Sequence, residues 1–124
     1  MKEIMAIIRM NKLAQTKKAL VEAGFEGLTA TKALGRGKLL KDLSLLDKVQ
    51  DENRDMVLES LLKGGRLIPK RLITLVVKDA DVQKAVDTII KANQEGNIGD
   101  GKIFLLPLAD VIRIRTGESG EAAV

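Results

Sequence analysis

The pattern of apolar and polar residues begins with a strand and a helix. Residues 2–9 are β-prone and apolar at successive positions, which predicts a strand covered on both faces. The helix that follows is predicted to be capped by Asn11 and ended by Gly24. Residues 27–37 alternate again and predict a second strand that runs into two glycines. The helix is marked by residues at helical spacing: Leu13, Lys17, Leu20 and Val21.

The clearest strand pattern in the chain lies at residues 71–77. Asp79 or Asp81 is the predicted N-cap of the helix that follows, and Gly96 is the residue predicted to end it. The apolar stripe of that helix consists of Val82, Ala85, Val86, Ile89 and Ile90. The second half of the chain therefore repeats the strand–helix order of the first half.

Two short segments near the end of the chain, residues 102–106 and 110–115, are predicted strands separated by Pro107. The order strand–helix–strand, insertion, strand–helix–strand predicts an α+β fold of the ferredoxin-like βαββαβ type. Two helices cover only one face of such a sheet. The apolar positions of residues 2–9 and 71–77 on the other face therefore predict association of subunits. The alternative is that one strand is misassigned and the second face is not apolar.

A long insertion at residues 38–68 separates the two halves of the pattern. Connections of this length in a small domain are uncommon, and they are usually functional or disordered. Residues 41–63 are dense in charge, and four apolar residues could share one face of a short helix: Val57, Leu58, Leu61 and Leu62. Two interpretations remain open, a mobile loop with a short turn of helix, or an arm that becomes ordered on binding a partner.

Several residue types are absent from the 124-residue chain, and this excludes classes of function. There is no Cys and no His, which excludes thiol nucleophiles, histidine triads and Cys/His zinc sites. There is no Trp or Tyr and there are only two Phe, so stacking surfaces for nucleic acid are not expected. We expect a cytoplasmic protein without a signal peptide, a membrane-spanning segment or a metal site of its own. The net charge of +4 suits an anionic ligand.

Residues 95–104 carry three glycines within six residues, followed by Lys102. Glycines allow backbone N–H groups to approach an anion closely. The spacing from Gly96 to Lys102 matches a Walker A loop, but Ile103 stands where Mg²⁺ requires Ser or Thr. The stretch also precedes a strand instead of a helix. Taken alone, it is either a plain helix-to-strand turn or an anion-binding loop.

Two further basic elements favour an anion-binding function. Arg113 and Arg115 alternate on one predicted strand, so both guanidinium groups would point to the same face and suit phosphates. Residues 35–38, Gly-Arg-Gly-Lys, form another corner of glycine and basic residues at a strand end. Together the three elements predict polyphosphate binding. Asp100 and Asp110 are the only candidate bases near the glycines, and a turn cap and a strand start explain them better than catalysis does.

These motifs resemble a known family. Residues 99–104, Gly-Asp-Gly-Lys-Ile-Phe, and residues 111–118, Val-Ile-Arg-Ile-Arg-Thr-Gly-Glu, are similar to the B-loop and C-terminal signature of the PII nitrogen signal-transduction proteins. Residues 66–71, together with residues 7–11 and 16–20, are most similar to the nitrogenase-associated PII subfamily, in particular to its second, longer paralogue.

The resemblance implies one PII-like domain over residues 1–124 that assembles as a homotrimer of ferredoxin-like subunits. Residues 38–68 fall where the family has its T-loop, the effector arm, and residues 116–124 form a C-terminal tail. The family binds ATP or ADP in clefts between subunits, with Mg²⁺ accompanying ATP, and it takes 2-oxoglutarate as the signal of carbon and nitrogen status.

The resemblance also implies ligand contacts residue by residue. Ile7, Thr29 and Val76 match positions that surround the adenine, and Lys70 matches the lysine that pairs with a 2-oxoglutarate carboxylate. The residues that match phosphate contacts are Gly35, Gly37, Lys38, Gly99, Asp100, Gly101, Lys102, Arg113 and Arg115. Leu39 stands where many members have a glutamine that ligates Mg²⁺, which an aliphatic side chain cannot do. The T-loop tyrosine that is uridylylated in some bacteria is also missing, because the chain has no Tyr.

The function implied by the resemblance is regulation and not catalysis. The T-loop would bind a nitrogenase component and inhibit it when nitrogen is plentiful, and ATP with 2-oxoglutarate would relieve the block. A paralogous PII protein is a further expected partner, whereas nucleic acid and membrane insertion are not expected. The alternative is a PII regulator of an ammonium transporter or a nitrogen-assimilation enzyme. A ligand that binds one state of the arm better than another would shift the population of the arm.

Overall fold

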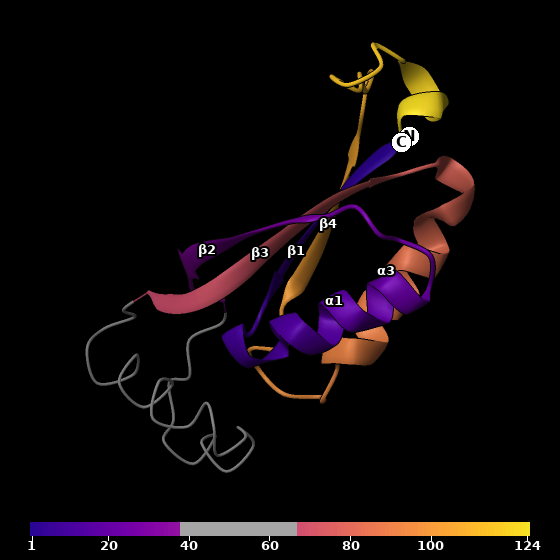
Figure 1. Cartoon of the computed structure of the whole chain (residues 1–124). Helices are drawn as coiled ribbons and strands as arrows, with labels where there is room; N and C mark the ends of the chain where they lie inside the picture. Colours follow the sequence, from indigo (N-terminus) through magenta and orange to yellow (C-terminus); the bar gives the residue numbers. More distant parts are fainter. Residues whose placement is uncertain (38–66) are drawn as a thin grey trace, which may run out of the picture.

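The computed structural model describes residues 1–37 and 67–124, so the predicted arm lies outside it except for its last two residues. Four strands and two α-helices form the described part of the chain (Figure 1). These elements are β1 (Lys2–Ile8), α1 (Leu13–Glu22), β2 (Thr29–Gly35), β3 (Ile68–Val77), α3 (Val82–Asn93) and β4 (Lys102–Pro107). Short 3-10 helices are η1 (Met10–Lys12), η3 (Asp79–Asp81) and η4 (Gly120–Ala123). Since β3 begins at Ile68, the insertion ends one residue earlier than predicted.

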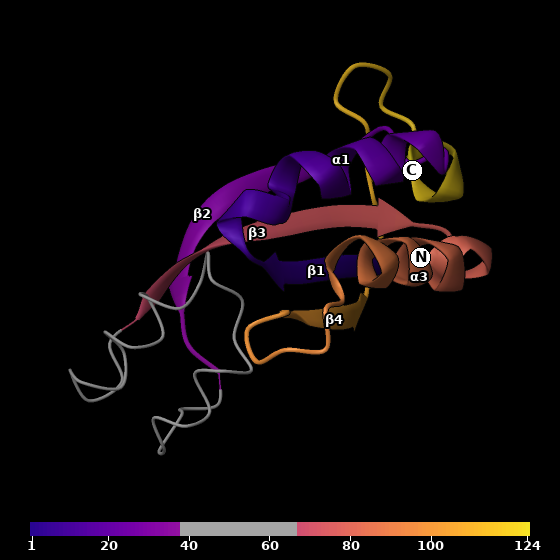
Figure 2. The ribbon, with the colours of Figure 1, turned by 90° about the horizontal axis from the view of Figure 1, so that it is seen from below.

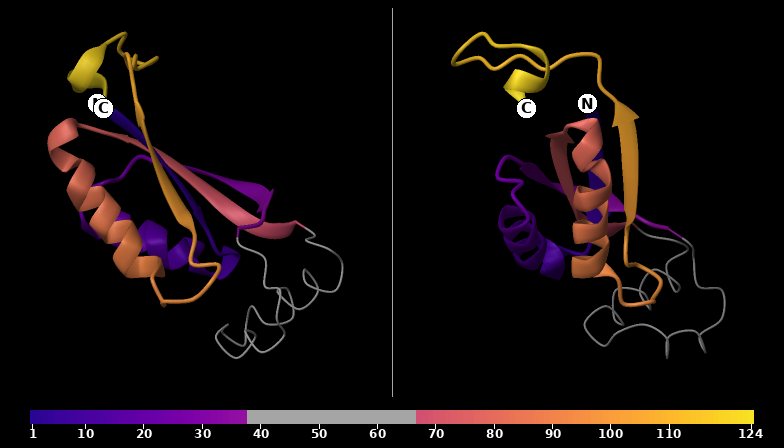
Figure 3. Two further views of the ribbon diagram at one scale, coloured as in Figure 1. Left: turned by 180° about the vertical axis from the view of Figure 1, so that it is seen from behind. Right: turned by 90° about the vertical axis from the view of Figure 1, so that its right-hand side faces the viewer.

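The strands form one antiparallel sheet in the order β2–β3–β1–β4. Both α-helices lie on the same face of this sheet, as the view from below shows (Figure 2). The two helices run side by side (Figure 3). They also contact each other, because Gln15 Nε2 of α1 donates a 2.8 Å hydrogen bond to the Ala92 carbonyl of α3. This strand order is that of the ferredoxin-like βαββαβ fold and confirms the predicted α+β class.

The core lies between the sheet and the two helices. Alternate residues of a strand point to one face, so β1 and β3 each supply every second side chain to this layer. The buried residues are Ile4, Ala6, Ile8, Ile73, Leu75 and Val77 of the sheet, with Leu20, Ala85 and Ile89 of the helices. The strand periods therefore predict the core positions of β1 and β3, whereas Val21 and Ile90 of the predicted helix stripes are exposed.

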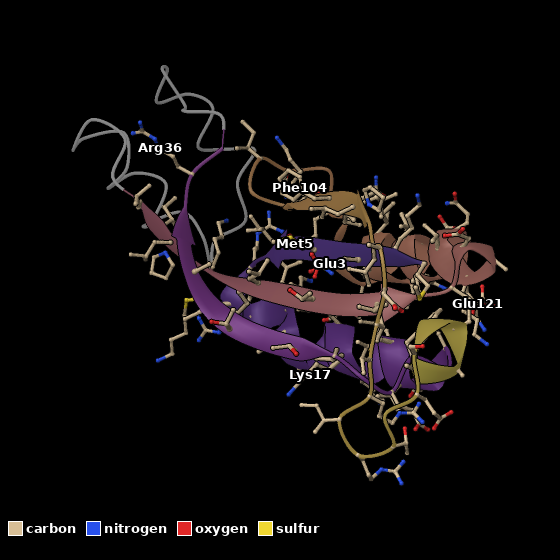
Figure 4. All side chains as sticks on the ribbon, turned by 90° about the horizontal axis from the view of Figure 1, so that it is seen from above. Glu3, Met5, Lys17, Arg36, Phe104 and Glu121 are labelled. Carbon is tan, nitrogen blue, oxygen red and sulfur yellow. The ribbon has the colours of Figure 1, made fainter. Side chains whose placement is uncertain are left out.

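The opposite face of the sheet is not covered by either helix, and it carries apolar side chains together with polar ones such as Glu3 and Thr74. Met5 and Phe104 are paired neighbours on β1 and β4, and Figure 4 shows both on this open face. Phe104 is 43% exposed and Leu106, on the same face, is 37% exposed. Both β1 and β3 form as predicted, so the open face exists in the subunit. Its apolar residues lie among polar ones, with Glu3 and Thr74 beside Met5.

The segment after β4 differs from the prediction. Residues 110–115 do not form a strand, and their one bridge pairs Ile112 with Ser119. The chain turns back on itself, because the Gly117 N–H donates to the Arg113 carbonyl at 2.7 Å and the Arg113 N–H donates to the Glu118 carbonyl at 2.8 Å. These local hydrogen bonds replace those of a strand ladder, so Arg113 and Arg115 do not share one strand face.

The predicted start of the first helix is also wrong. Asn11 lies inside η1, and α1 begins two residues later without a side-chain cap. The 3-10 turn, closed by the Lys12 N–H on the Arg9 carbonyl at 3.1 Å, moves Asn11 out of the cap position. The helix end is predicted correctly, since Gly24 follows it with a φ of +97°.

At the second helix, neither predicted cap acts through its side chain. Asp81 occupies the N-cap position of α3 without a side-chain hydrogen bond, and Asp79 instead pairs with the Met1 ammonium at 2.9 Å. The helix ends at Asn93, before Gly96. In the two described ranges, no helix is both long enough and apolar enough to cross a membrane.

Candidate anion-binding site

The glycine-rich stretch is a tightly built loop at one end of the sheet. Residues 94–101, which we call the glycine loop, connect α3 to β4 (Figure 1). Gly96, Gly99 and Gly101 have φ values of +79°, +100° and +115°. A Cβ on Gly101 would lie 2.1 Å from the Ile7 carbonyl oxygen of β1. Only glycine therefore allows the loop to approach β1 this closely.

Asp100 organises the glycine loop from within. Its Oδ2 accepts hydrogen bonds from the backbone N–H groups of Glu95 and Gly96, both at 2.9 Å, and from Asn97 at 3.3 Å. Burial alone would raise the pKa of Asp100, but the hydrogen bonds from Glu95, Arg9 and Gly96 outweigh burial and lower it. A carboxylate held ionised by three N–H groups is suited to fixing a turn and poorly suited to accepting a proton. This agrees with the turn cap predicted for it.

Arg9 lies beneath the glycine loop and is only 2% exposed. Its two terminal nitrogens form ion pairs with Glu95 Oε2 at 3.1 Å and with Asp100 Oδ1 at 2.9 Å. The nitrogen that faces Asp100 also lies 3.4 Å from the Ile98 carbonyl oxygen. Lys12 of η1 pairs with the other carboxylate oxygen of Glu95 at 2.7 Å. Both carboxylates of this region are thus neutralised by buried or half-buried cations.

Arg9, Lys12 and Glu95 are not among the site residues that the sequence predicts. The one signal for them is that Arg9 ends a run of apolar residues, where a charged side chain needs a partner if it is buried. Its charged partners, Glu95 and Asp100, lie in the glycine loop far along the chain, and no local pattern shows them.

Lys70 of β3, which the resemblance assigns to a 2-oxoglutarate carboxylate, lies against the glycine loop. Its Nζ lies 3.5 Å from the Gly99 carbonyl oxygen. Burial, and then the charge of Arg9, lower the pKa of Lys70, while Asp100 opposes this shift. Lys102 is exposed at the start of β4 and is paired across the sheet with Ile7. The two lysines bring positive charge to either side of the loop.

The corner at residues 35–38 lies at the same end of the sheet. Gly35 closes β2 opposite Ile68, which is two residues before Lys70 in β3. A Cβ at Gly35 or Gly37 would meet nothing within 4 Å, so the protein's own packing does not require these glycines. Lys38 and Leu39 lie outside the described residues. Figure 4 shows Arg36 just beyond the end of β2.

Among the remaining predicted site residues, Thr29 lies at the middle of the sheet, level with Met5, and Val76 lies toward the other end. Thr29 and Val76 share the open sheet face with Ile7, but Val76 is paired with Glu3 near the start of β1. The C-terminal segment begins beside Met1, whose carbonyl accepts a hydrogen bond from the Leu108 N–H at 3.4 Å (Figure 3).

Arg113 and Arg115 belong to this C-terminal segment. Arg113 is engaged there by the Glu118 carboxylate and the Ala122 carbonyl, each at 3.2 Å. Seven residues of β1 span about 20 Å between the two ends of the sheet. One subunit therefore divides the predicted contacts into two groups. The first group is Ile7, Gly35, Gly37, Lys70, Gly99, Asp100, Gly101 and Lys102, and the second is Val76, Arg113 and Arg115, while Thr29 lies between the two groups.

Comparisons with known proteins agree with this architecture. The family model described as nitrogen regulatory protein P-II matches residues 1–118. The nitrogen fixation nifHD region glnB-like protein 2 of Methanococcus maripaludis is 46% identical over 126 residues and covers the full length of both chains. The nitrogen regulatory protein P-II of Rhodospirillum rubrum is 41% identical over 124 residues, again over the full length of both.

A solved structure gives the same result. The crystal structure of Arabidopsis thaliana PII bound to citrate superposes with a TM-score of 0.74 at 32% identity, covering 99% of this chain and 91% of that one. The resemblance to the nitrogenase-associated group is confirmed by relatives that carry the nifHD-region name, including one from Methanosarcina barkeri at 42% identity over the whole of this chain and 99% of the relative. The chain therefore belongs to the nitrogen regulatory protein P-II family, which is a family of signalling regulators.

Proposed function

We propose that this protein is a non-catalytic PII regulator that binds ATP or ADP and 2-oxoglutarate and controls nitrogenase by direct binding. In this proposal residues 1–124 form one PII-like domain, with an effector arm at residues 38–68 and a tail at residues 116–124. The arm contacts a nitrogenase component, and a paralogous PII protein acts beside it in the cytoplasm. The observation that carries the proposal is the glycine loop, rigidly held and flanked by lysines.

The residues of the glycine loop fit a bound polyphosphate. Its glycines leave the backbone open to close approach by an anion, and Asp100 fixes the turn from its inner side. Four cations surround the loop against two carboxylates, which leaves an excess positive charge for phosphate groups. These charged residues are Arg9, Lys12, Lys70 and Lys102 against Glu95 and Asp100.

The division of contacts into two groups supports a homotrimer with nucleotide sites between subunits. A single subunit keeps Arg113 and Arg115 far from the glycine loop, so a second subunit must bring its own C-terminal segment to complete the site. The open face around Met5 and Phe104 gives association a driving force, because burying its apolar side chains removes apolar surface from water.

For 2-oxoglutarate, Lys70 is the described cation at the end of the arm and the edge of the loop. Leu39 supplies no ligand for Mg²⁺, and the described residues hold no group of three metal-ligating side chains. We propose that Mg²⁺ enters with ATP and is held mainly by the phosphates and 2-oxoglutarate. Because Leu39 gives Mg²⁺ no side-chain ligand, 2-oxoglutarate binding in this proposal depends more strongly on bound ATP than it would with a glutamine at this position.

The first test is a calorimetric titration of the purified protein. ADP and MgATP are expected to bind, and 2-oxoglutarate is expected to bind only when MgATP saturates the protein. Binding of neither nucleotide would refute the proposal. Binding of nucleotide but not of 2-oxoglutarate would limit the protein to sensing adenylate and place any 2-oxoglutarate response in a partner. Release of phosphate from ATP would contradict the non-catalytic role.

The second test concerns the target. Deletion of residues 41–63 is expected to abolish inhibition of nitrogenase while ADP affinity stays within about threefold, since the described site lies outside the deleted segment. Loss of nucleotide binding in this variant would refute the division between a binding site and an effector arm. If the intact protein leaves nitrogenase activity unchanged but captures an ammonium transporter or a nitrogen-assimilation enzyme, nitrogenase is not the target and the captured protein takes its place in the proposal.

A further inference from the structure

We propose that Arg9 is the positioning residue of the glycine loop: it sets the conformation in which the loop binds an anion, without contacting the ligand itself. This inference rests on the proposed nucleotide site and gives a role there to a residue to which neither the sequence motifs nor the family resemblance assigns one. The observation behind it is a buried guanidinium that contacts three separate points of one loop.

The geometry places Arg9 where it can act on the loop but not on a ligand. It follows β1 directly, it is 2% exposed, and its contacts are with Glu95, Ile98 and Asp100. A Cβ on Gly99 would lie 3.5 Å from its terminal nitrogen, so the backbone of the loop rests on the guanidinium.

The two carboxylates define both ends of the turn. Glu95 stands near its start and Asp100 near its end, and one guanidinium joins them at 3.1 and 2.9 Å. Asp100 in turn accepts the N–H groups of residues 95, 96 and 97 through its other oxygen. Arg9 therefore orients the acceptor that closes the turn, in the way an outer residue orients a metal ligand.

The arrangement depends on one side chain reaching both carboxylates at once as well as on its positive charge. The planar fork presents several N–H donors at fixed angles, whereas a lysine ammonium is a single point of charge. Lys12 already supplies an ammonium to the far oxygen of Glu95 at 2.7 Å. Lysine in place of Arg9 would retain the charge but would lose one of the two carboxylate contacts.

The test uses Arg9→Lys and Glu95→Gln in the full-length protein, with Glu22→Gln as the control. Glu22 is exposed on α1 and pairs with Lys18 at 4.0 Å, so the control makes the same chemical change away from the loop. We expect ADP to bind about 10-fold more weakly to both loop variants, the lower end of the range for outer positioning residues. ADP should bind the control as it binds the unmodified protein.

A second readout needs no nucleotide. Amide hydrogen exchange should accelerate at residues 95–97, whose N–H groups bond to Asp100, while the amides of β1 and β3 keep their protection. Arg9→Gln is a third variant, which removes the buried positive charge. If Arg9→Gln does not fold, Glu95→Gln still tests the contact between Arg9 and the glycine loop.

Three results would overturn the inference. They are ADP affinity within twofold of the unmodified protein in Arg9→Lys and Glu95→Gln, unchanged exchange at residues 95–97, or an equal loss of protection throughout the core, which would show a general structural role. If the unmodified protein binds no nucleotide, the proposed function fails, but the exchange experiment still decides whether Arg9 positions the loop.

Discussion

Replacing Gly101 with alanine perturbs the closest approach between the glycine loop and β1. The new Cβ would lie 2.1 Å from the Ile7 carbonyl oxygen, whereas real Cβ atoms essentially never come within 3.0 Å of another heavy atom. The loop or the strand must therefore shift by about 1 Å. The atom in contact belongs to the backbone of a paired strand, which cannot rotate away as a side chain could.

Two costs add up at Gly101. A non-glycine residue at its φ of +115° is strained by about 1–3 kcal/mol. Forcing an extra carbon into a packed position costs about another 1–3 kcal/mol. We expect Gly101→Ala to lower the free energy of unfolding by about 4 kcal/mol, a large part of the roughly 5–15 kcal/mol typical of a domain.

Gly96→Ala is the matched control for this prediction. Gly96 lies in the same loop with a φ of +79°, but a Cβ there would meet nothing within 4 Å. Only the backbone strain remains, and the loss of unfolded-chain entropy partly offsets it, so we expect a cost of about 1 kcal/mol. The difference between the two variants isolates the contact with Ile7.

Urea unfolding followed by far-UV circular dichroism measures both variants, because the chain has no Trp or Tyr to serve as a fluorescent probe. Protein concentration is kept constant, since association of subunits would raise apparent stability. If Gly101→Ala is destabilised to within about 1 kcal/mol of Gly96→Ala, the close approach does not exist in solution and the reasoning is refuted.

Four further predictions concern side chains. Asp100→Asn should cost about 3 kcal/mol by weakening the hydrogen bonds to a charged acceptor. Because the folded-state pKa of Asp100 is lowered, its contribution exists above the ordinary value of about 3.9 and disappears as pH falls through the folded-state value, so acid unfolding curves should show a loss in the parent that the variant lacks. The pKa of Lys70 is lowered by burial, so the unfolded chain binds more protons, and parent stability should rise relative to Lys70→Met as pH approaches about 10.4; a flat difference would contradict the burial of its charge. Asn11→Ala should change the free energy of unfolding by less than about 0.5 kcal/mol, since Asn11 caps no helix. Thr16→Val should lower the free energy of unfolding by about 1–3 kcal/mol, because the buried Thr16 hydroxyl accepts a hydrogen bond from Asn93 Nδ2 at 3.0 Å. Equal costs for Asn11→Ala and Thr16→Val would contradict a helix that begins after Asn11.

The fold could be predicted from local patterns because its strands and helices have simple hydrophobic periods. Alternation in residues 71–77 places Ile73, Leu75 and Val77 in the core, as the strand prediction requires. The helix end at Gly24 was equally accessible, since a positive φ after a helix favours glycine. Element ends that depend on side-chain capping were predicted less well, as Asn11 shows.

The candidate site could be predicted only in part. The glycines and Lys70 of one end were identified, and the structure brings them together. The alternation of apolar and basic residues in the C-terminal segment predicts a strand. A turn at Gly117 satisfies the backbone there through local hydrogen bonds, so the segment does not join an edge of the sheet.

The sequence by itself determined the order of strands and helices, the buried face of the sheet and the glycine loop, because these depend on periodicity and on the conformational freedom of glycine among near neighbours. Tertiary structure alone decided that Arg9 is buried between Glu95 and Asp100, and that Arg113 lies far from the loop within one subunit. The physical reason is that burial and charge pairing depend on segments distant in the chain, which meet only after the sheet has brought its ends into place.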